Sequence, residues 1–146
     1  KIDFLDNVFT LFRKYSITPK RIIFEVIESD IIDNANVTDV LRALRKAGSK
    51  IAIDDFGTGA SSYSRLRTLD ADILKIDGSF IRNILTDEFS RCAVRSFCEV
   101  AKLKNMEVVA EFVENEEIEK MLITMGIGWL QGYHIGKPVP IELAEL

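Results

Sequence analysis

The sequence predicts an α/β protein, namely about five parallel β/α units of a partial TIM-like (β/α) barrel. Two observations lead to this fold class. Short runs rich in β-branched residues alternate along the chain with longer segments of helical periodicity, a pattern typical of parallel βαβ units. Each predicted strand also carries acidic, basic or amide residues near its carboxyl end, where barrel enzymes collect their functional groups.

The first elements are a helix, a strand and a second helix. Residues 3–15 have apolar side chains at helical spacing, and we expect Pro19 to stop any helix after them. Residues 22–27 form a run of apolar and β-branched residues that predicts the first strand. Residues 36–47 return to helical spacing, and Gly48 is expected to end that helix.

The middle of the chain predicts two further strands. Residues 50–54 are expected to form the second strand, followed by a glycine-rich turn at 57–59 and a short helix near 61–69. Residues 72–76 predict the third strand, and 87–104 a long helix.

The last third repeats the pattern. Residues 107–111 predict the fourth strand, 116–125 a helix and 129–131 a short fifth strand. Residues 140–143 are expected to begin one more helix, with a proline at its first turn.

Two architectures fit five strands separated by helices: an open doubly wound sheet and a barrel. An open sheet concentrates functional groups near its switch point, whereas a barrel brings all its strand ends to one mouth. The polar residues favour the barrel, because they occur at every predicted strand. They are Glu25 and Glu28, Asp54 and Asp55, Lys75 and Asp77, Glu111 and Glu114, and Gln131.

The chain has 146 residues, whereas an eight-stranded barrel typically needs about 250. We therefore expect about three strands upstream, and residues 1–146 to be part of one domain. Alone, such a piece would expose two sheet edges and is expected to associate or aggregate.

Composition excludes some classes of function. The chain is 47% hydrophobic and 29% charged, as in ordinary globular proteins, and its net charge of −4 is a poor match for long nucleic acid. No run of about 18 apolar residues occurs, so we expect no membrane segment here. Cys92 and Cys98 lie six positions apart on a predicted helix and are not expected to pair. We expect a cytoplasmic domain, whose parent protein could be anchored in a membrane elsewhere.

The adjacent acids Asp54 and Asp55 end a predicted strand of apolar residues. Two carboxylates there would repel each other, and a divalent cation would remove that cost. A bend at Asp55 would turn both toward one site, and Glu25 and Glu111 would add hard oxygen ligands suited to Mg²⁺ or Mn²⁺. The alternative is that an Asp-Asp pair only caps a turn. Zinc is disfavoured, because no His or Cys cluster has zinc spacing.

Several carboxylates and one lysine suit metal-assisted hydrolysis of a phosphodiester. Two metal ions a few ångströms apart stabilise the attacking and leaving oxygens of such a reaction. Lys75 would lower the pKa of the attacking water or neutralise developing charge. The alternative is a plain salt bridge between Lys75 and Asp77.

These residues resemble the motifs of the EAL family. Five segments match in the family's order over essentially the whole chain. They are Phe24-Glu25-Val26-Ile27-Glu28-Ser29, the loop beginning Asp54-Asp55-Phe56-Gly57-Thr58-Gly59, Leu74-Lys75-Ile76-Asp77, Val109-Ala110-Glu111-Phe112-Val113-Glu114, and Gln131-Gly132-Tyr133 followed by Gly136-Lys137-Pro138. The resemblance implies the C-terminal portion of a bacterial cyclic-di-GMP phosphodiesterase domain.

The resemblance also implies roles for single residues. Glu25 and Asp54 are expected to bind a first Mg²⁺ or Mn²⁺ ion, with Asp54 bridging to a second ion held by Asp55. Lys75 and Glu111 would position and deprotonate the attacking water.

Four further residues receive roles in the same way. Gln131 would hydrogen-bond near the attacking water. Glu28 would anchor the loop at 56–62, which in this family shapes the metal site and couples it to a dimer interface. Asp77 and Pro138 are expected to contact the substrate.

The implied reaction opens cyclic di-GMP to linear pGpG. The expected partners are cyclic di-GMP, a second copy in a homodimer and a fused sensory or GGDEF domain. The Glu-Ala-Leu motif and an Asn ligand of the family would lie before Lys1, so we expect this piece alone to be inactive.

The sequence departs from the family at three positions. Phe112 replaces a glycine beside Glu111, Ile27 replaces a threonine, and Ala60 occupies a position that is often aromatic. The competing function is a non-catalytic receptor that binds cyclic di-GMP or a protein. Such members typically lose acids of the metal site, which are present here, so the enzyme is favoured.

Overall fold

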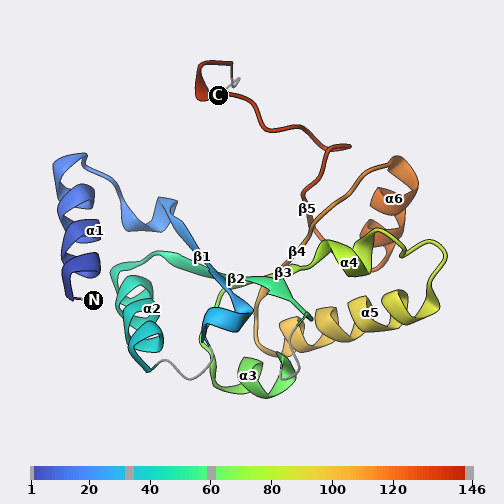
Figure 1. Cartoon of the computed structure of the whole chain (residues 1–146), viewed down its shortest axis with the longest axis horizontal. Coiled ribbons are helices and arrows are strands. Elements are labelled where there is room, and N and C mark those ends of the chain that lie inside the picture. The colour runs from blue at the N-terminus through green and yellow to red at the C-terminus, as the bar shows by residue number, and fades with distance from the viewer. Residues whose placement is uncertain (1, 32–34, 59–61, 144–146) are drawn as a thin grey trace. The chain divides into compact units, whose positions relative to one another are not determined.

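The computed structural model describes residues 2–31, 35–58 and 62–143 (Figure 1). It divides into two compact units, Lys1–Lys75 and Ile76–Leu146. The strand order is β1-β2-β3-β4-β5, so neighbouring strands are successive in the chain. Strand β1 pairs in parallel with β2, and β4 with β5. The predicted α/β class with parallel strands in one sheet is confirmed.

The first unit begins with helix α1 (Ile2–Lys14), a single 3₁₀ turn η1 (Pro19–Arg21) and strand β1 (Ile23–Ile27). Helix α1 ends before Pro19, as expected, and Pro19 begins the 3₁₀ turn, which was not predicted. The reason is that the first position of a helical turn needs no backbone N–H donor, and proline supplies the required φ. A second 3₁₀ turn, η2 (Glu28–Ile31), follows β1 and was not predicted.

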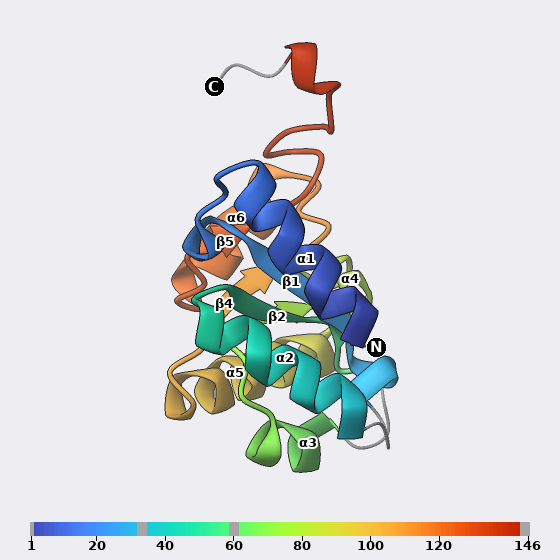
Figure 2. The ribbon, with the colours of Figure 1, turned by 90° about the vertical axis from the view of Figure 1, so that its left-hand side faces the viewer.

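Helix α2 (Ala35–Ala47) and strand β2 (Lys50–Phe56) come next, then helix α3 (Ser62–Thr68) and strand β3 (Ile73–Ile76). Strand β2 runs two residues beyond its predicted end, through both acids. Helix α1 lies beside β1, and α2 lies beside β2 (Figure 2). The rings of Phe12 and Phe24 join α1 to β1, with centroids 6.5 Å apart.

A bidentate ion pair fixes α2 against the start of β2. The Arg45 guanidinium donates from Nη2 to Asp72 Oδ1 at 2.8 Å and from Nε to Oδ2 at 3.1 Å. The backbone N–H of Ile51 donates to the same Asp72 Oδ2 at 2.9 Å. The hydrogen bond to Asp72 raises the pKa of Arg45 above its usual value. Asp72 therefore connects α2, β2 and the beginning of β3.

In the second unit, residues 76–143 are described and contain three helices, two paired strands and a 3₁₀ turn. Its elements are α4 (Gly78–Ile81), α5 (Glu88–Leu103), β4 (Glu107–Ala110), α6 (Glu116–Thr124), β5 (Trp129–Leu130) and η3 (Ile141–Leu143). Helix α4 was not predicted, because four residues are too few to show a period. The last segment is a 3₁₀ turn where we expected the start of an α-helix.

Side chains cap the longer helices of this unit. Asp87 accepts hydrogen bonds from the N–H groups of Phe89 and Ser90 at the start of α5, and Asn115 accepts from Ile118 at the start of α6. Cys92 and Cys98 on α5 are free thiols, as predicted. Among the described residues, no helix has the length and apolar character needed to cross a membrane.

Candidate functional site

Lys75 is the centre of a charged cluster in the first unit. It lies in β3, every residue of which is buried, and its own exposed fraction is 5%. Its Nζ atom lies 3.2 Å from Glu25 Oε2 and 3.0 Å from Asp54 Oδ1. A buried ammonium group requires such partners, because removing a charge from water is otherwise costly.

Strand register brings the two carboxylates to Lys75. Glu25 lies opposite Ala52 in the parallel pair, and Ile27 lies opposite Asp54. Side chains two positions apart on a strand share a face, so Glu25 and Asp54 project from the same face of the β1–β2 pair. The sequence analysis placed both at strand ends, and the structure brings them together.

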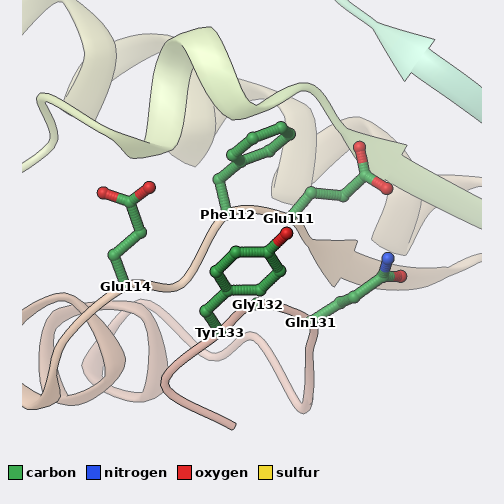
Figure 3. A pocket seen from close by; sticks show the side chains of 6 residues that line it. All are labelled: Glu111, Phe112, Glu114, Gln131, Gly132 and Tyr133. Atoms are coloured by element: carbon green, nitrogen blue, oxygen red, sulfur yellow. The ribbon is translucent and has the colours of Figure 1, made fainter. Parts of the chain in front are cut away.

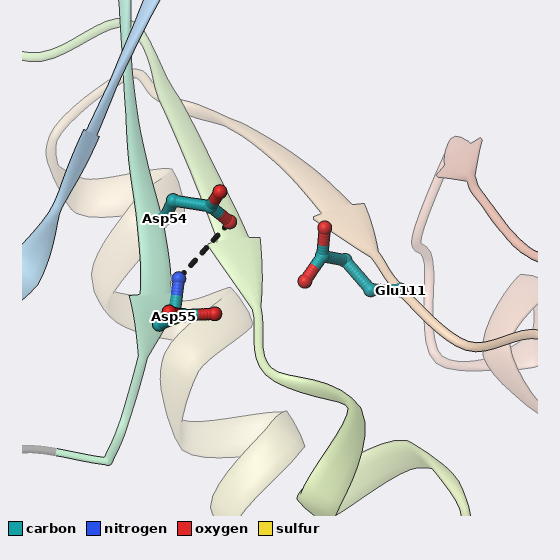
Figure 4. A group of neighbouring side chains, drawn as sticks. All are labelled: Asp54, Asp55 and Glu111. Carbon is teal, nitrogen blue, oxygen red and sulfur yellow. Dashed lines mark hydrogen bonds between the residues drawn. The ribbon is translucent and has the colours of Figure 1, made fainter.

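The backbone at Asp55 adopts an unusual conformation, and the carboxylates of Asp54 and Asp55 lie near each other. Asp55 has a positive φ of 55°, a region that residues with a Cβ rarely occupy, although Asp tolerates it better than most. Its N–H donates to Asp54 Oδ1 at 3.0 Å (Figure 4). One carboxylate oxygen of each residue lies within 4.8 Å of the other. This backbone turn agrees with the bend that we expected at Asp55.

This cluster fits a divalent cation. Three carboxylates, from Glu25, Asp54 and Asp55, outnumber the single ammonium group of Lys75, and hard oxygen donors are the ligands that Mg²⁺ and Mn²⁺ prefer. Asp54 and Asp55 would both offer carboxylate oxygens to such an ion. The donor set therefore suits the predicted metal class.

Glu28 supports the segment that follows β2. It is buried, and its Oε2 accepts a hydrogen bond from the Gly57 N–H at 3.2 Å. Gly57 has a φ of 101°, which favours glycine. The contact agrees with the predicted anchoring role for the first part of the loop. Residues 59–61 of that loop, including Ala60, lie outside the described residues.

The second unit contains a cavity of about 230 Å³ after β4 and β5 (Figure 3). It is lined by Glu111, Phe112, Glu114, Gln131, Gly132 and Tyr133. Glu111 is 8% exposed, and its N–H donates to Ile76 O at 3.4 Å. Two residues predicted to be catalytic, Glu111 and Gln131, thus line one cavity.

Backbone pairing beyond the strands shapes this cavity. The N–H of Gln131 donates to Ala110 O at 2.9 Å, and the N–H of Val113 donates to Gln131 O at 3.0 Å. A Cβ on Gly132 would overlap the backbone of Val113, so only glycine fits there. The segment after β4 is therefore held tightly against the segment after β5.

The remaining two predicted residues are described separately. Asp77 accepts a hydrogen bond from the Ser79 N–H at 2.9 Å and caps α4. Pro138 is exposed, in irregular chain after β5. Neither arrangement tests their predicted contact with a substrate.

Sequence reasoning gave no role to Tyr133, which lines the cavity, or to Arg82, which contacts the lining residue Phe112. Tyr133 belongs to a quoted motif, yet it was noted only as part of that motif. Arg82 places its guanidinium over the Phe112 ring, 4.2 Å from the centroid. No signal identified Arg82, because it follows a helix too short to be predicted.

Comparisons with known proteins identify relatives over most of the chain. The EAL domain family model matches residues 2–138. Cyclic di-GMP phosphodiesterase PdeF of Escherichia coli strain K12 is 50% identical over 136 residues, which cover 92% of this chain and 18% of PdeF. The chain therefore spans less than a fifth of that relative.

Solved structures show the same fold. The EAL enzyme Bd1971, in its cAMP- and cyclic-di-GMP-bound form, has a TM-score of 0.92 and 37% identity, covering 96% of this chain and 37% of that chain. A manganese and cyclic-di-GMP complex of Klebsiella pneumoniae BlrP1 has a TM-score of 0.81 and 34% identity, covering 88% and 34%. EAL domains have a TIM-like barrel, so the predicted fold class is confirmed.

Proposed function

The chain belongs to the EAL domain family, and from this we propose that the protein containing it hydrolyses cyclic di-GMP to linear pGpG in bacterial second-messenger signalling. The observation that carries the proposal is the cluster in which buried Lys75 contacts both Glu25 and Asp54, at the motif positions of a family whose relatives include cyclic di-GMP phosphodiesterases. The chain retains every acid that the family resemblance assigns to the metal site within its length.

We propose that Glu25, Asp54 and Asp55 would hold two Mg²⁺ or Mn²⁺ ions. The nearness of the Asp54 and Asp55 carboxylate oxygens and the contacts of Glu25 and Asp54 with Lys75 support this. The bound ions would lower the pKa of a coordinated water and offset charge on the phosphate. A manganese complex of BlrP1 supports the choice of metal class.

The chain's own residues would act on the attacking water. Glu111, largely buried beside the cavity, would accept the water's proton as a general base, and Gln131 would orient the water by hydrogen bonding. Lys75 would place its positive charge near the phosphate oxygens. The water oxygen would bond to phosphorus while the bond from phosphorus to O3′ breaks, leaving a 5′-phosphate on pGpG and a proton on O3′.

Asp77 and Pro138 would contact the nucleotide, and Glu28 would keep the loop after β2 in place. The Glu28–Gly57 hydrogen bond supports the last role. We also propose that the protein forms a homodimer and carries a fused sensory or GGDEF domain. The much greater length of PdeF supports additional segments in the parent protein. Free thiols at Cys92 and Cys98 fit the proposed cytoplasmic location.

The test is hydrolysis in ¹⁸O-labelled water. The complete protein with Mg²⁺ or Mn²⁺ should convert cyclic di-GMP to pGpG that carries one ¹⁸O in its 5′-phosphate, measured by mass spectrometry. EDTA should stop the reaction. Tight binding of intact cyclic di-GMP without turnover would instead identify a receptor, and neither binding nor turnover would overturn both functions.

A further inference from the structure

Phe112 has a conformation that its residue type disfavours. It directly follows Glu111 and has a positive φ of 55°. Residues with a Cβ rarely occupy this left-handed region, and a bulky side chain tolerates it poorly. Contacts of the side chain must therefore compensate for the backbone cost.

Those contacts come from α4, immediately after β3. A Cβ added to Gly78 would lie 2.6 Å from Phe112 Cγ, well inside van der Waals contact, so the ring occupies the space that the missing side chain leaves. Arg82, one helical turn later, lies over the same ring at 4.2 Å from its centroid. Cation–π attraction stabilises this arrangement.

The two segments that the ring joins carry proposed functional groups. Glu111 precedes Phe112, and the N–H of Glu111 donates to Ile76 O. Asp77, proposed to contact the nucleotide, caps α4 immediately before Gly78. The residue after Phe112, Val113, packs its backbone against Gly132. The Phe112 ring therefore lies between the end of β4 and the start of α4.

We propose that Phe112 is a positioning residue, which packs on Gly78 and beneath Arg82 and so fixes Glu111 relative to Asp77. This role rests on the proposed function. The glycine of the family would adopt this positive φ without cost but would make no contact with α4, whereas the Phe112 ring holds the segment after Glu111 against Gly78 and Arg82. The ring thus connects the segment after β4 to α4, and the absence of a side chain at Gly78 leaves the space that the ring occupies.

The test is a double-mutant cycle in the complete protein. Gly78→Ala should clash with the ring and lower kcat for cyclic di-GMP about ten-fold or more, since small misplacement of catalytic groups is costly. Gly78 has no positive φ, so the added methyl group has no backbone penalty. In a Phe112→Gly background the same change should cost less than about two-fold, because the clashing ring is gone.

Phe112→Gly alone should lower kcat, and Phe112→Tyr, which retains the ring, should lower it less than Phe112→Gly does. Gly128→Ala is the matched control, since a Cβ there meets no atom within 4 Å. Thermal midpoints show whether each variant remains folded. Equal kcat losses from Gly78→Ala in both backgrounds, or unchanged kcat in Phe112→Gly, would overturn the positioning role.

Measurements on the same variants distinguish failure of the positioning role from failure of the proposed hydrolysis. If wild-type protein binds cyclic di-GMP without hydrolysing it, the proposed hydrolysis fails, and the cycle is then measured as Kd by titration calorimetry. Background-dependent loss of affinity would still support positioning by Phe112. Equal losses in both backgrounds, or no binding by the wild-type protein, would overturn it.

Discussion

The ammonium group of Lys75 lies 3.0 Å from the carboxylate of Asp54, and Lys75 is 5% exposed. Its second carboxylate partner, Glu25, is 3.2 Å away and more exposed to solvent. A lysine so buried can neutralise its neighbours in the resting protein and also present a charge to an anionic substrate.

Lys75→Met should weaken both folding and catalysis. Losing the charged contacts with Glu25 and Asp54 should lower the free energy of unfolding by about 1–3 kcal/mol. The loss is limited because solvent screens the contact with the exposed Glu25. Activity should fall about 10²-fold or more. Urea denaturation in EDTA and an initial-rate assay measure the two effects. Lys46→Met, at an exposed position on α2, is the control and should change neither.

Glu28 should affect both stability and turnover through its hydrogen bond with the Gly57 N–H, although we do not propose it as a metal ligand. Glu28→Ala removes the acceptor at 3.2 Å and should cost about 1–3 kcal/mol of unfolding free energy. Glu28→Gln keeps an acceptor oxygen and should cost less. Denaturation and metal-dependent turnover are to be compared for both variants. Full activity in a folded Glu28→Ala protein would contradict the anchoring role.

Asp87 should make stability depend on pH. The Ser90 hydroxyl and two backbone N–H groups hydrogen-bond its carboxylate and lower its pKa below the usual 3.8. Because the folded-state pKa is the lower one, the stabilisation is present above pH 3.8 and is lost as pH falls through the folded-state value. The stability difference between wild type and Asp87→Asn should therefore shrink below pH 4. A constant difference between pH 7 and pH 3 would contradict this.

The two thiols on α5 should differ in reactivity. Burial raises the pKa of the Cys98 thiol, whereas Cys92 is exposed. Since the thiolate is the reactive form, Cys92 should react with Ellman's reagent on the order of ten times faster near pH 7.5. Peptide mass spectrometry assigns each rate, and Cys92→Ser should leave only the slow phase. Equal rates would show that Cys98 becomes accessible in solution.

Long periodic segments of the fold were predictable from the sequence. Helix α5 and strand β2 were found because their apolar spacing is set by burial of one face. Helix α4 and turn η2 were missed, since three or four residues cannot show a period. Turn η1, which begins at Pro19, was also not predicted, because proline both ends and begins helical turns.

The candidate site, like the fold, was predictable only in part. Glu25, Asp54 and Lys75 could be selected as chemical groups at strand ends, but their contacts depend on register, which no local pattern specifies. The contacts of Phe112 with Gly78 and Arg82 join positions thirty or more residues apart in sequence. Phe112 was recognised as a substitution, while its positive φ became visible only in the structure.

The central claim is that Asp54 binds the catalytic metal, and the most direct measurement is turnover as a function of Mn²⁺ concentration. Asp54→Asn should lower kcat about 10²-fold or more and raise the Mn²⁺ concentration needed for half-maximal activity. Asp39→Asn, whose side chain is 72% exposed beside Arg42, should match the wild-type curve. A folded Asp54→Asn protein with the wild-type Mn²⁺ curve and undiminished kcat would contradict the claim.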